Sequence, residues 1–262
     1  MILKMSEATP VRRWKGVCAY DGTDFEGWQS QPRGNTIQDI LEARLKVIFK
    51  KQVRIQGSAR TDSGVHAKQQ VFHFDEAWAH PSESLYKALL SELPEGILLK
   101  SLRPVPKSFH ALRSARGKKY VYRIYEGQAE PMESRYSWSI GWRKLNVENM
   151  QKAAASLIGT HDFTAFSAAG GSPGDNPVKE VRLIKITKKG SKIKIVVEGS
   201  GFLYKMVRRI TGTLYNVGLG RLDPEKVKSL LENRKRELII QTAPAKGLCL
   251  ERVYYNEVGK GH

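Results

Sequence analysis

Two alternating segments joined by a short turn constrain the fold of this chain more than any other feature. Residues 181–187 and 193–197 place apolar side chains at nearly every second position, and the Lys189-Gly190-Ser191 segment between them suits a hairpin turn. Strands joined by a short hairpin must pair antiparallel. The sequence also contains no GxGxxG or GKS/T phosphate loop, which disfavours a doubly wound nucleotide-binding fold.

Apolar periodicity predicts strands and helices along the rest of the chain. The helix after Thr36 has the clearest start, because Thr36 can cap it and Asp39 follows three residues later. Segment 165–177 is rich in glycine and proline and predicts a loop. Further strands are expected at 11–20, 53–55, 70–74, 97–102, 119–125 and 248–255, and helices at 37–49, 84–90, 147–158, 202–217 and from Asp223 onward.

This mixture of strands and helices predicts the α+β fold class with a largely antiparallel sheet. A length of 262 residues suits two modest domains. We expect a disordered tail at 1–10, an N-terminal α+β domain at 11–106 and a C-terminal α+β domain at 107–262.

The charge balance points to a polyanionic partner. Forty-four Lys and Arg against 26 Asp and Glu give a formal net charge of +18 and a pI near 9.9. Cations placed against phosphates release condensed counterions, so nucleic acid is favoured, although a solubilising surface is the alternative. No apolar stretch is long enough to span a bilayer or to form a signal peptide. With only Cys18 and Cys249, far apart, we expect a soluble protein of the reducing cytoplasm without disulfides or structural zinc.

The segment 57–67 carries the strongest chemical signal. It surrounds Arg60 and Asp62 with small residues, so a planar ligand could approach closely and the short carboxylate would be exposed yet fixed. The alternative is an ordinary turn in which Asp62 bonds its own backbone.

Two cationic segments support a nucleic-acid site. Tyr120 lies within a run of five basic residues that contains no acid: Arg113, Arg116, Lys118, Lys119 and Arg123. Between Lys179 and Arg209 there are ten basic residues and only two acids. Aromatic rings among cations suit base stacking beside phosphates, although snorkelling lysines on a solvated sheet remain an alternative. Arg208 lies one position off an apolar helical stripe and could face solvent or a cleft.

Five blocks together resemble the tRNA pseudouridine synthase A family, in the order that the family shows. They are YDGTDFEGWQSQ at 20–31, TIQ at 36–38, RTDSGVHA at 60–67, DFTAF at 162–166 and MVR at 206–208. The resemblance runs from about Tyr20 to Tyr255. It implies two similar subdomains that merge across a central basic cleft, and isomerisation of uridine to pseudouridine at positions 38, 39 and 40 of the tRNA anticodon stem-loop. It also implies a homodimer that needs no cofactor and no metal.

The resemblance assigns roles residue by residue. Asp62 matches the nucleophilic aspartate, and Arg60 matches the arginine that helps to hold the target nucleotide out of its stack. Tyr120 matches the tyrosine that packs on the target base, and Arg208 matches the arginine that pairs with the nucleophile. Leu248 fits an apolar position under the base.

The chain departs from the family pattern at three positions. Ala59 stands where a glycine is usual and Ser63 where an alanine is common, and both residues are small enough to preserve the loop. Leu112 stands where an arginine is usual, which puts one phosphate contact in doubt unless Arg113 replaces it.

Two other functions compete with this interpretation. A non-catalytic RNA-binding protein could use the same cationic cleft, and a metal-dependent nuclease would depend on a divalent ion. The histidines show no metal-binding spacing. Asp21 and Asp24 resemble a magnesium pair only weakly, because a capping role in their Gly-Thr turn is simpler.

Overall fold

The computed structural model describes residues 9–32, 34–171 and 175–256. Most of the tail expected at 1–10 therefore lies outside the described residues, as does part of the loop expected at 165–177. No helix within the described ranges is long and apolar enough to cross a membrane.

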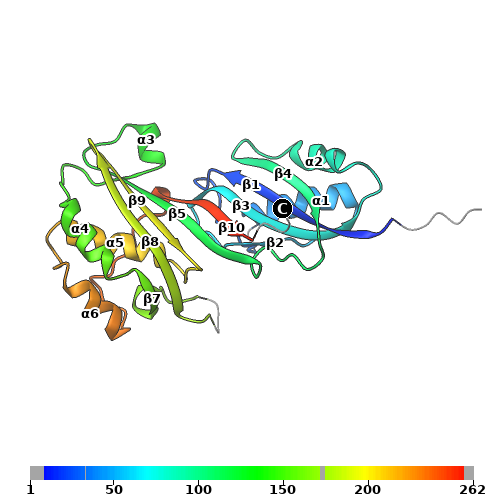
Figure 1. Cartoon of the computed structure of the whole chain (residues 1–262). Coiled ribbons are helices and arrows are strands. Elements are labelled where there is room, and N and C mark those ends of the chain that lie inside the picture. The colour runs from blue at the N-terminus through cyan, green and yellow to red at the C-terminus, as the bar shows by residue number, and fades with distance from the viewer. Residues whose placement is uncertain (1–8, 33, 172–174, 257–262) are drawn as a thin grey trace, which may run out of the picture.

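The described chain forms one ten-stranded sheet with helices packed on it (Figure 1). The strands are β1 (Val11–Tyr20), β2 (Gln56–Gly57), β3 (His66–Ala77), β4 (Ile97–Val105), β5 (Ala115–Tyr125), β6 (Trp138–Ser139), β7 (Gly159–Asp162), β8 (Val178–Lys189), β9 (Lys192–Gly199) and β10 (Leu248–Tyr255). The helices are α1 (Ile37–Phe49), α2 (Ser82–Leu90), α3 (Pro131–Arg135), α4 (Val147–Ala155), α5 (Met206–Gly218) and α6 (Lys226–Asn233), with 3-10 turns at Thr164–Phe166 and Ala245–Gly247.

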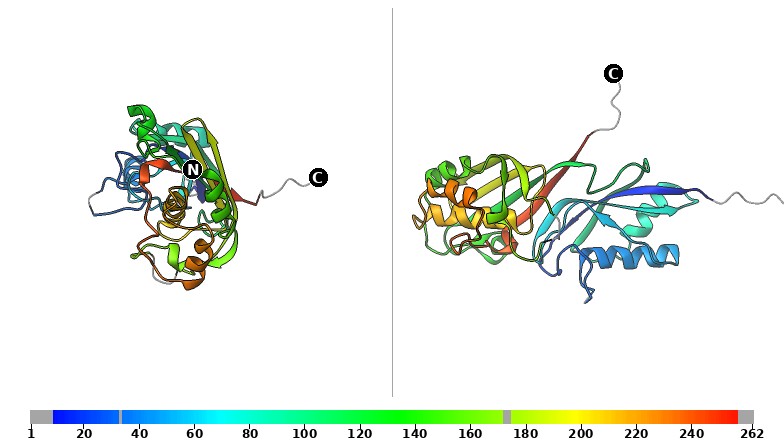
Figure 2. Two further views of the ribbon diagram at one scale, coloured as in Figure 1. Left: turned by 90° about the vertical axis from the view of Figure 1, so that its left-hand side faces the viewer. Right: turned by 90° about the horizontal axis from the view of Figure 1, so that it is seen from below.

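Strand β10 joins the two halves of the sheet. The strand order is β4-β1-β3-β10-β5-β9-β8-β7, with β2 added on β3 and β6 on β5. β10 pairs antiparallel with β5 over most of its length and parallel with β3 at two positions, and the other pairs along this order are antiparallel. Helices α1 and α2 lie at one end and α4, α5 and α6 at the other, with β10 between them in the view from below in Figure 2. This topology confirms the predicted mixed fold with a mostly antiparallel sheet.

Most predicted elements are present, and several boundaries move. Thr36 caps α1 as expected, since its hydroxyl accepts a hydrogen bond from the Asp39 amide at 3.1 Å. The predicted hairpin is also confirmed, because Lys189 pairs with Lys192 across the turn. Helix α4 ends three residues before the predicted limit, and α6 begins at Lys226 instead of Asp223.

Two predictions are wrong for local reasons. Residues 53–55 do not form a strand: Val53 and Ile55 are buried, but the Ile55 amide donates to the Glu42 carboxylate at 3.0 Å and not to a neighbouring strand. Phe202 does not belong to α5. Lys205 has a left-handed φ of 57°, so the chain turns before the helix begins at Met206.

Candidate functional site

Asp62 lies in the connection from β2 to β3, and a fully buried glutamine holds this connection in place. The Gln70 side-chain oxygen accepts from the Ser58 hydroxyl at 2.7 Å and the Ala59 amide at 3.2 Å, and its nitrogen donates to the Ala59 carbonyl at 2.7 Å. The Tyr20 hydroxyl bonds the Thr61 hydroxyl at 2.8 Å. These contacts satisfy the polar groups on the buried side of the connection, so Asp62 projects from a rigid support.

A second loop fixes the same connection from outside, and it does so by backbone contact. The Trp28 amide donates to the Thr61 carbonyl at 3.0 Å. Gly27 has φ +89°, and a Cβ there would lie 2.5 Å from the Thr61 oxygen and 3.0 Å from the Asp62 carbonyl carbon. Gly22 approaches equally closely, since its Cβ would lie 2.0 Å from the Val65 oxygen. Glycine is therefore required where the YDGTDFEGWQSQ block meets the RTDSGVHA block.

Arg208, on the first turn of α5, reaches Asp62 across the sheet. Its Nη1 lies 2.5 Å from the Asp62 Oδ2, and its Nε donates to the Ala243 carbonyl at 2.8 Å. The side chains of Arg208 and Asp62 are 13% and 17% exposed, so the ion pair is mostly shielded from water. Because both ends of the guanidinium are bonded, it restrains the carboxylate in one orientation.

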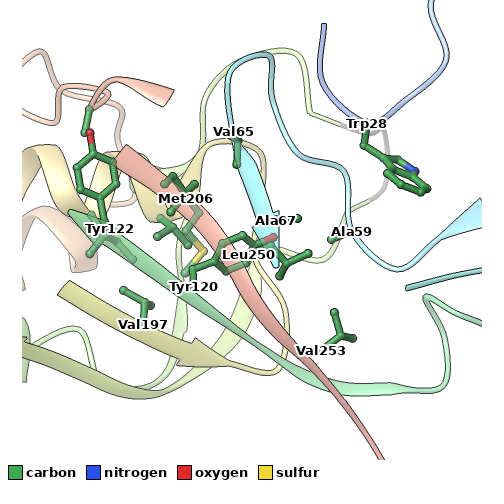
Figure 3. Packing of buried hydrophobic residues seen from close by; sticks show 14 of the residues in the cluster. Trp28, Ala59, Val65, Ala67, Tyr120, Tyr122, Val197, Met206, Leu250 and Val253 are labelled. Atoms are coloured by element: carbon green, nitrogen blue, oxygen red, sulfur yellow. The ribbon is translucent and has the colours of Figure 1, made fainter. Parts of the chain in front are cut away.

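A pocket of about 390 Å³ surrounds this ion pair, counting the part that opens to solvent. Tyr120 and Leu248 supply buried walls from β5 and β10, and the ring of Phe202 meets that of Tyr120 edge-on at 5.3 Å between centroids. Figure 3 shows Tyr120, Met206 and Leu250 gathered where β10 lies beside β5. Aromatic and aliphatic walls around a single ion pair suit a flat, weakly polar ring such as a nucleobase.

Burial and the nearby Asp62 carboxylate raise the pKa of Tyr120 well above its usual range. Its hydroxyl therefore stays protonated at neutral pH, and the ring presents an uncharged surface. Among the described residues that line the pocket, Asp62 is the one carboxylate, against the three cations Arg60, Lys205 and Arg208. The exposed Arg60 lies on the pocket lining two residues before Asp62.

The structure thus brings into one pocket the five residues to which the resemblance assigns a role: Arg60, Asp62, Tyr120, Arg208 and Leu248. Leu112 and Arg113 do not line it and are exposed. Asp21 and Asp24 both bond Arg135 of α3, at 2.8 and 3.0 Å. The described ranges contain no group of three or more His, Cys, Asp or Glu side chains arranged to hold a metal ion.

Sequence reasoning missed several residues that shape the site. Phe202 lines the pocket beside Tyr120, but helical spacing had placed it on α5. Gln70 was predicted only as part of a strand, and a lone glutamine gives no signal of the three contacts that it makes to the Asp62 connection. The period-two alternation of β5 does place Lys118 on the same face as Tyr120, so that residue could have been found.

Known proteins match this chain along most of its length. The family model for tRNA pseudouridine synthase matches residues 17–112 and 153–256. "tRNA pseudouridine synthase A" of Bacillus subtilis is 43% identical over 247 residues, covering 93% of this chain and 99% of that protein. "tRNA pseudouridine synthase A 2" of Clostridium perfringens is 41% identical over 246 residues, covering 94% and 100%.

Among solved structures, the one titled "Structure of H/ACA RNP bound to a substrate RNA containing 2'-deoxyuridine" matches 95% of this chain and 71% of its own, with 10% identity and a TM-score of 0.32. That likeness is too slight to carry an argument. The sequence matches confirm the resemblance drawn from the five blocks. The chain belongs to the tRNA pseudouridine synthase family of isomerases.

Proposed function

We propose that this isomerase converts uridine to pseudouridine at positions 38, 39 and 40 of the tRNA anticodon stem-loop, with Asp62 as its nucleophile. The observation that carries the proposal is the shielded Asp62–Arg208 ion pair inside a pocket walled by Tyr120 and Leu248. A carboxylate beside aromatic and aliphatic walls, and the one acidic group among the described residues that line the pocket, is the group that can react with a ring placed there.

The reaction requires the base to leave its stack. Uridine breaks its bond from C1′ to N1, the uracil turns, a bond forms from C1′ to C5, and the C5 proton is released while N1 gains one. These atoms are hidden in a stacked loop, so flipping the nucleotide costs a few kcal/mol. Packing of the flipped base on Tyr120 and entry of Arg60 into the vacated space would offset part of that cost.

Asp62 would form a transient covalent bond to the flipped nucleoside, and this bond would break again before pseudouridine is released, which restores the free carboxylate. Arg208 would act on Asp62 as its positioning residue. The guanidinium is the counter-ion of the carboxylate and holds it in one orientation, as attack on a ring in the pocket requires. It also fixes the direction of attack through its second bond to the Ala243 carbonyl. Positioning and electrostatics supply the rate enhancement in this scheme.

We propose that two α+β domains, 11–106 and 107–262, share this pocket. The first would contribute Arg60 and Asp62, and the second would contribute Tyr120, Arg208 and Leu248. An anticodon arm lying between the domains would meet the cationic mouth of the pocket, in keeping with the net charge of +18.

We propose also that the protein acts as a homodimer in the cytoplasm. Both cysteines are free and buried, as suits a reducing compartment. An apolar hollow that includes Leu98, Met132 and Tyr136 supports dimerisation, since these side chains are 53%, 83% and 42% exposed. Arg123 and Cys249 also line this hollow. Each is the strand neighbour of a residue on the pocket face, Tyr122 and Leu248, so the hollow lies on the opposite face of the sheet from the Asp62 pocket.

The dimer has its own test by sedimentation velocity. Leu98→Asp should shift the dimer to monomer, whereas Val47→Asp, at an exposed position on α1, should not. A wild-type protein that sediments as a monomer at micromolar concentration would refute the dimer without affecting the proposed reaction.

Chemical mapping of pseudouridine in tRNA transcripts tests the proposed substrate. A transcript carrying uridine at 38, 39 and 40 should gain pseudouridine at those positions, and changing each uridine singly to cytidine should remove only the signal at that position. Pseudouridine formed elsewhere and absent from 38 to 40 would contradict the proposed site. Transcripts that bind but gain no pseudouridine would favour a non-catalytic RNA-binding protein.

A further inference from the structure

Lys118 is a buried cation on the pocket face of the sheet. It lies on β5 two residues before Tyr120, and only 9% of it is exposed. Its backbone neighbours are Gly199 on β9 and Val253 on β10, so the residue lies inside the sheet and not at an edge. Burial, together with the nearby charge of Lys179, lowers the pKa of Lys118 to about 8.

No hydrogen bond or ion pair joins the Lys118 ammonium to any residue in the described ranges. The adjacent Lys119, on the other face of β5, has an ordinary partner, because its Nζ lies 2.9 Å from Glu198. A second cation, Lys179, lies on the same face of the sheet, because Val181, two residues further along β8, pairs with Gly199, which is the β9 partner of Lys118. Its charge also lowers the pKa of Lys118. A mostly desolvated lysine beside another cation is unfavourable in the free protein, and an anion bound between the two ammonium groups would relieve both the desolvation and the repulsion.

We propose that Lys118 and Lys179 bind a backbone phosphate of the RNA strand next to the flipped uridine. This inference rests on the proposed function, because it takes the occupant of the Asp62 pocket to be a nucleotide. Residues two apart on a strand are roughly 6.8 Å apart, so the ammonium of Lys118 is within about one nucleotide of a base packed on Tyr120. Tyr120 and Lys118 are therefore neighbours on one face of β5. A base packed on Tyr120 and the adjacent phosphate of the same RNA strand are neighbours in the same way.

A phosphate suits this site better than a carboxylate ligand or a base edge. Lysine ammonium groups act as point charges that neutralise phosphate without needing a planar fork. The contact would carry no sequence information and would set the register of the strand against Asp62. Lys118 is thereby a positioning and binding residue and has no direct part in bond making.

The test measures tRNA affinity against salt concentration for Lys118→Met, which keeps most of the apolar stem of the side chain and removes the ammonium. We expect about a tenfold loss of affinity at 0.1 M salt and a log–log salt slope reduced by about 0.7 to 0.9, the value for one lost phosphate contact. The matched control is Lys194→Met, an exposed lysine of β9 that pairs with Arg123 on the opposite face. It should change affinity less than twofold and leave the slope unaltered.

Two further measurements separate binding from structure. Free Lys118→Met should melt at or above the wild-type temperature, because the variant removes an unpaired buried charge; a structural lysine would give a lower midpoint. Lys179→Met should lower the salt slope in the same way. The double variant should lose less binding free energy for tRNA than the sum of the losses of the two single variants, because both lysines would hold one phosphate.

The inference fails if Lys118→Met retains the wild-type salt slope, or if its effect equals that of Lys194→Met. Should Lys118→Met not fold, an unchanged slope in Lys179→Met overturns it equally. Mapping pseudouridine with the wild-type protein keeps the two proposals apart. If the wild-type protein forms pseudouridine at 38 to 40 but the salt slope of Lys118→Met is unchanged, only the phosphate site is refuted. If the wild-type protein forms no pseudouridine, the proposed function is refuted.

Discussion

Replacing Arg208 with methionine removes the guanidinium that restrains Asp62 while keeping an unbranched apolar stem. In the native protein the Nη1 of Arg208 lies 2.5 Å from the carboxylate and its Nε bonds Ala243 at 2.8 Å. The variant loses both contacts, so the carboxylate gains rotational freedom and loses its counter-charge. Because Arg208 is only 13% exposed and already neutralised by Asp62, it offers little charge to the RNA backbone.

The size of the effect follows from the geometry. Unit charges about 4 Å apart interact by about 4 kcal/mol at an effective dielectric constant of about 20, which suits a pair that is mostly shielded. If the lost charge interaction and the lost orientation of the carboxylate together cost the transition state about 2 to 4 kcal/mol relative to the bound ground state, kcat falls by about 30-fold to 1,000-fold, at 1.36 kcal/mol for each factor of ten. The affinity for tRNA should change by less than about threefold, since no phosphate contact is removed.

Single-turnover kinetics and filter binding with one tRNA transcript separate these two effects. Arg208→Lys should fall between the wild type and Arg208→Met, because an ammonium restores the charge but cannot bridge Asp62 and Ala243 together. Arg221→Met, at an exposed position, is the matched control and should match the wild type in both assays. Equal losses of turnover and affinity in Arg208→Met, or turnover within threefold of the wild type, would refute the reasoning.

Three further predictions concern the support of the site and the stability of the fold. Gly27→Ala should lose about 2 kcal/mol or more of stability in a urea titration, and most of its activity, because its Cβ would press on the Thr61 oxygen. The control Gly34→Ala, at a position with φ +76° and no atom within 4 Å of the added Cβ, should show only the smaller cost of backbone strain in the same titration. Gln70→Leu should lose about 3 kcal/mol or more of stability and lower kcat, since it leaves the Ser58 hydroxyl and the backbone of Ala59 unsatisfied in the interior. A thermal midpoint within 2 °C of wild type, which corresponds to a loss of about 1 kcal/mol or less, would contradict this. Burial lowers the pKa of His73 from 6.5 to about 4, so between these pH values the unfolded chain binds a proton that the folded chain does not. The stability that neutral His73 contributes is therefore present above pH 6.5 and should fall by at most about 3 kcal/mol as the pH drops from 6.5 to 4. His73→Gln should flatten this pH dependence in urea unfolding.

Local patterns predicted the elements that make most of their contacts within a short stretch of chain. The cap of α1, the hairpin of β8 and β9 and the full length of β10 all follow from spacing and turn chemistry. Segment 53–55 has the same alternation as a strand, but the Glu42 side chain takes the place of a neighbouring strand. Alternation of apolar residues indicates which side chains are buried. A buried segment that pairs with no strand has the same alternation in its sequence as a segment that does pair.

The chemistry of the site was predictable only in part. The small residues around Asp62 marked the loop, and the family resemblance supplied Tyr120 and Arg208 from segments 58 and 146 residues away. Helical spacing alone allows Arg208 to face either solvent or a cleft. In the structure it turns into the pocket, where its Nε bonds the Ala243 carbonyl and its Nη1 pairs with Asp62. The pocket position of Phe202 was not predicted, because its spacing matches the apolar positions of α5. The left-handed residue Lys205 turns the chain before α5 begins and so separates Phe202 from that helix.

The central claim is that Asp62 acts as a nucleophile on a uridine placed in its pocket. Release of tritium from a tRNA transcript labelled at C5 of uridine tests it most directly, because the C5 proton leaves only when the new carbon–carbon bond forms. Wild-type protein should release tritium, and Asp62→Asn should release none above background while binding the transcript within about threefold of wild type. Tritium release by Asp62→Asn at a rate within tenfold of wild type would contradict the account.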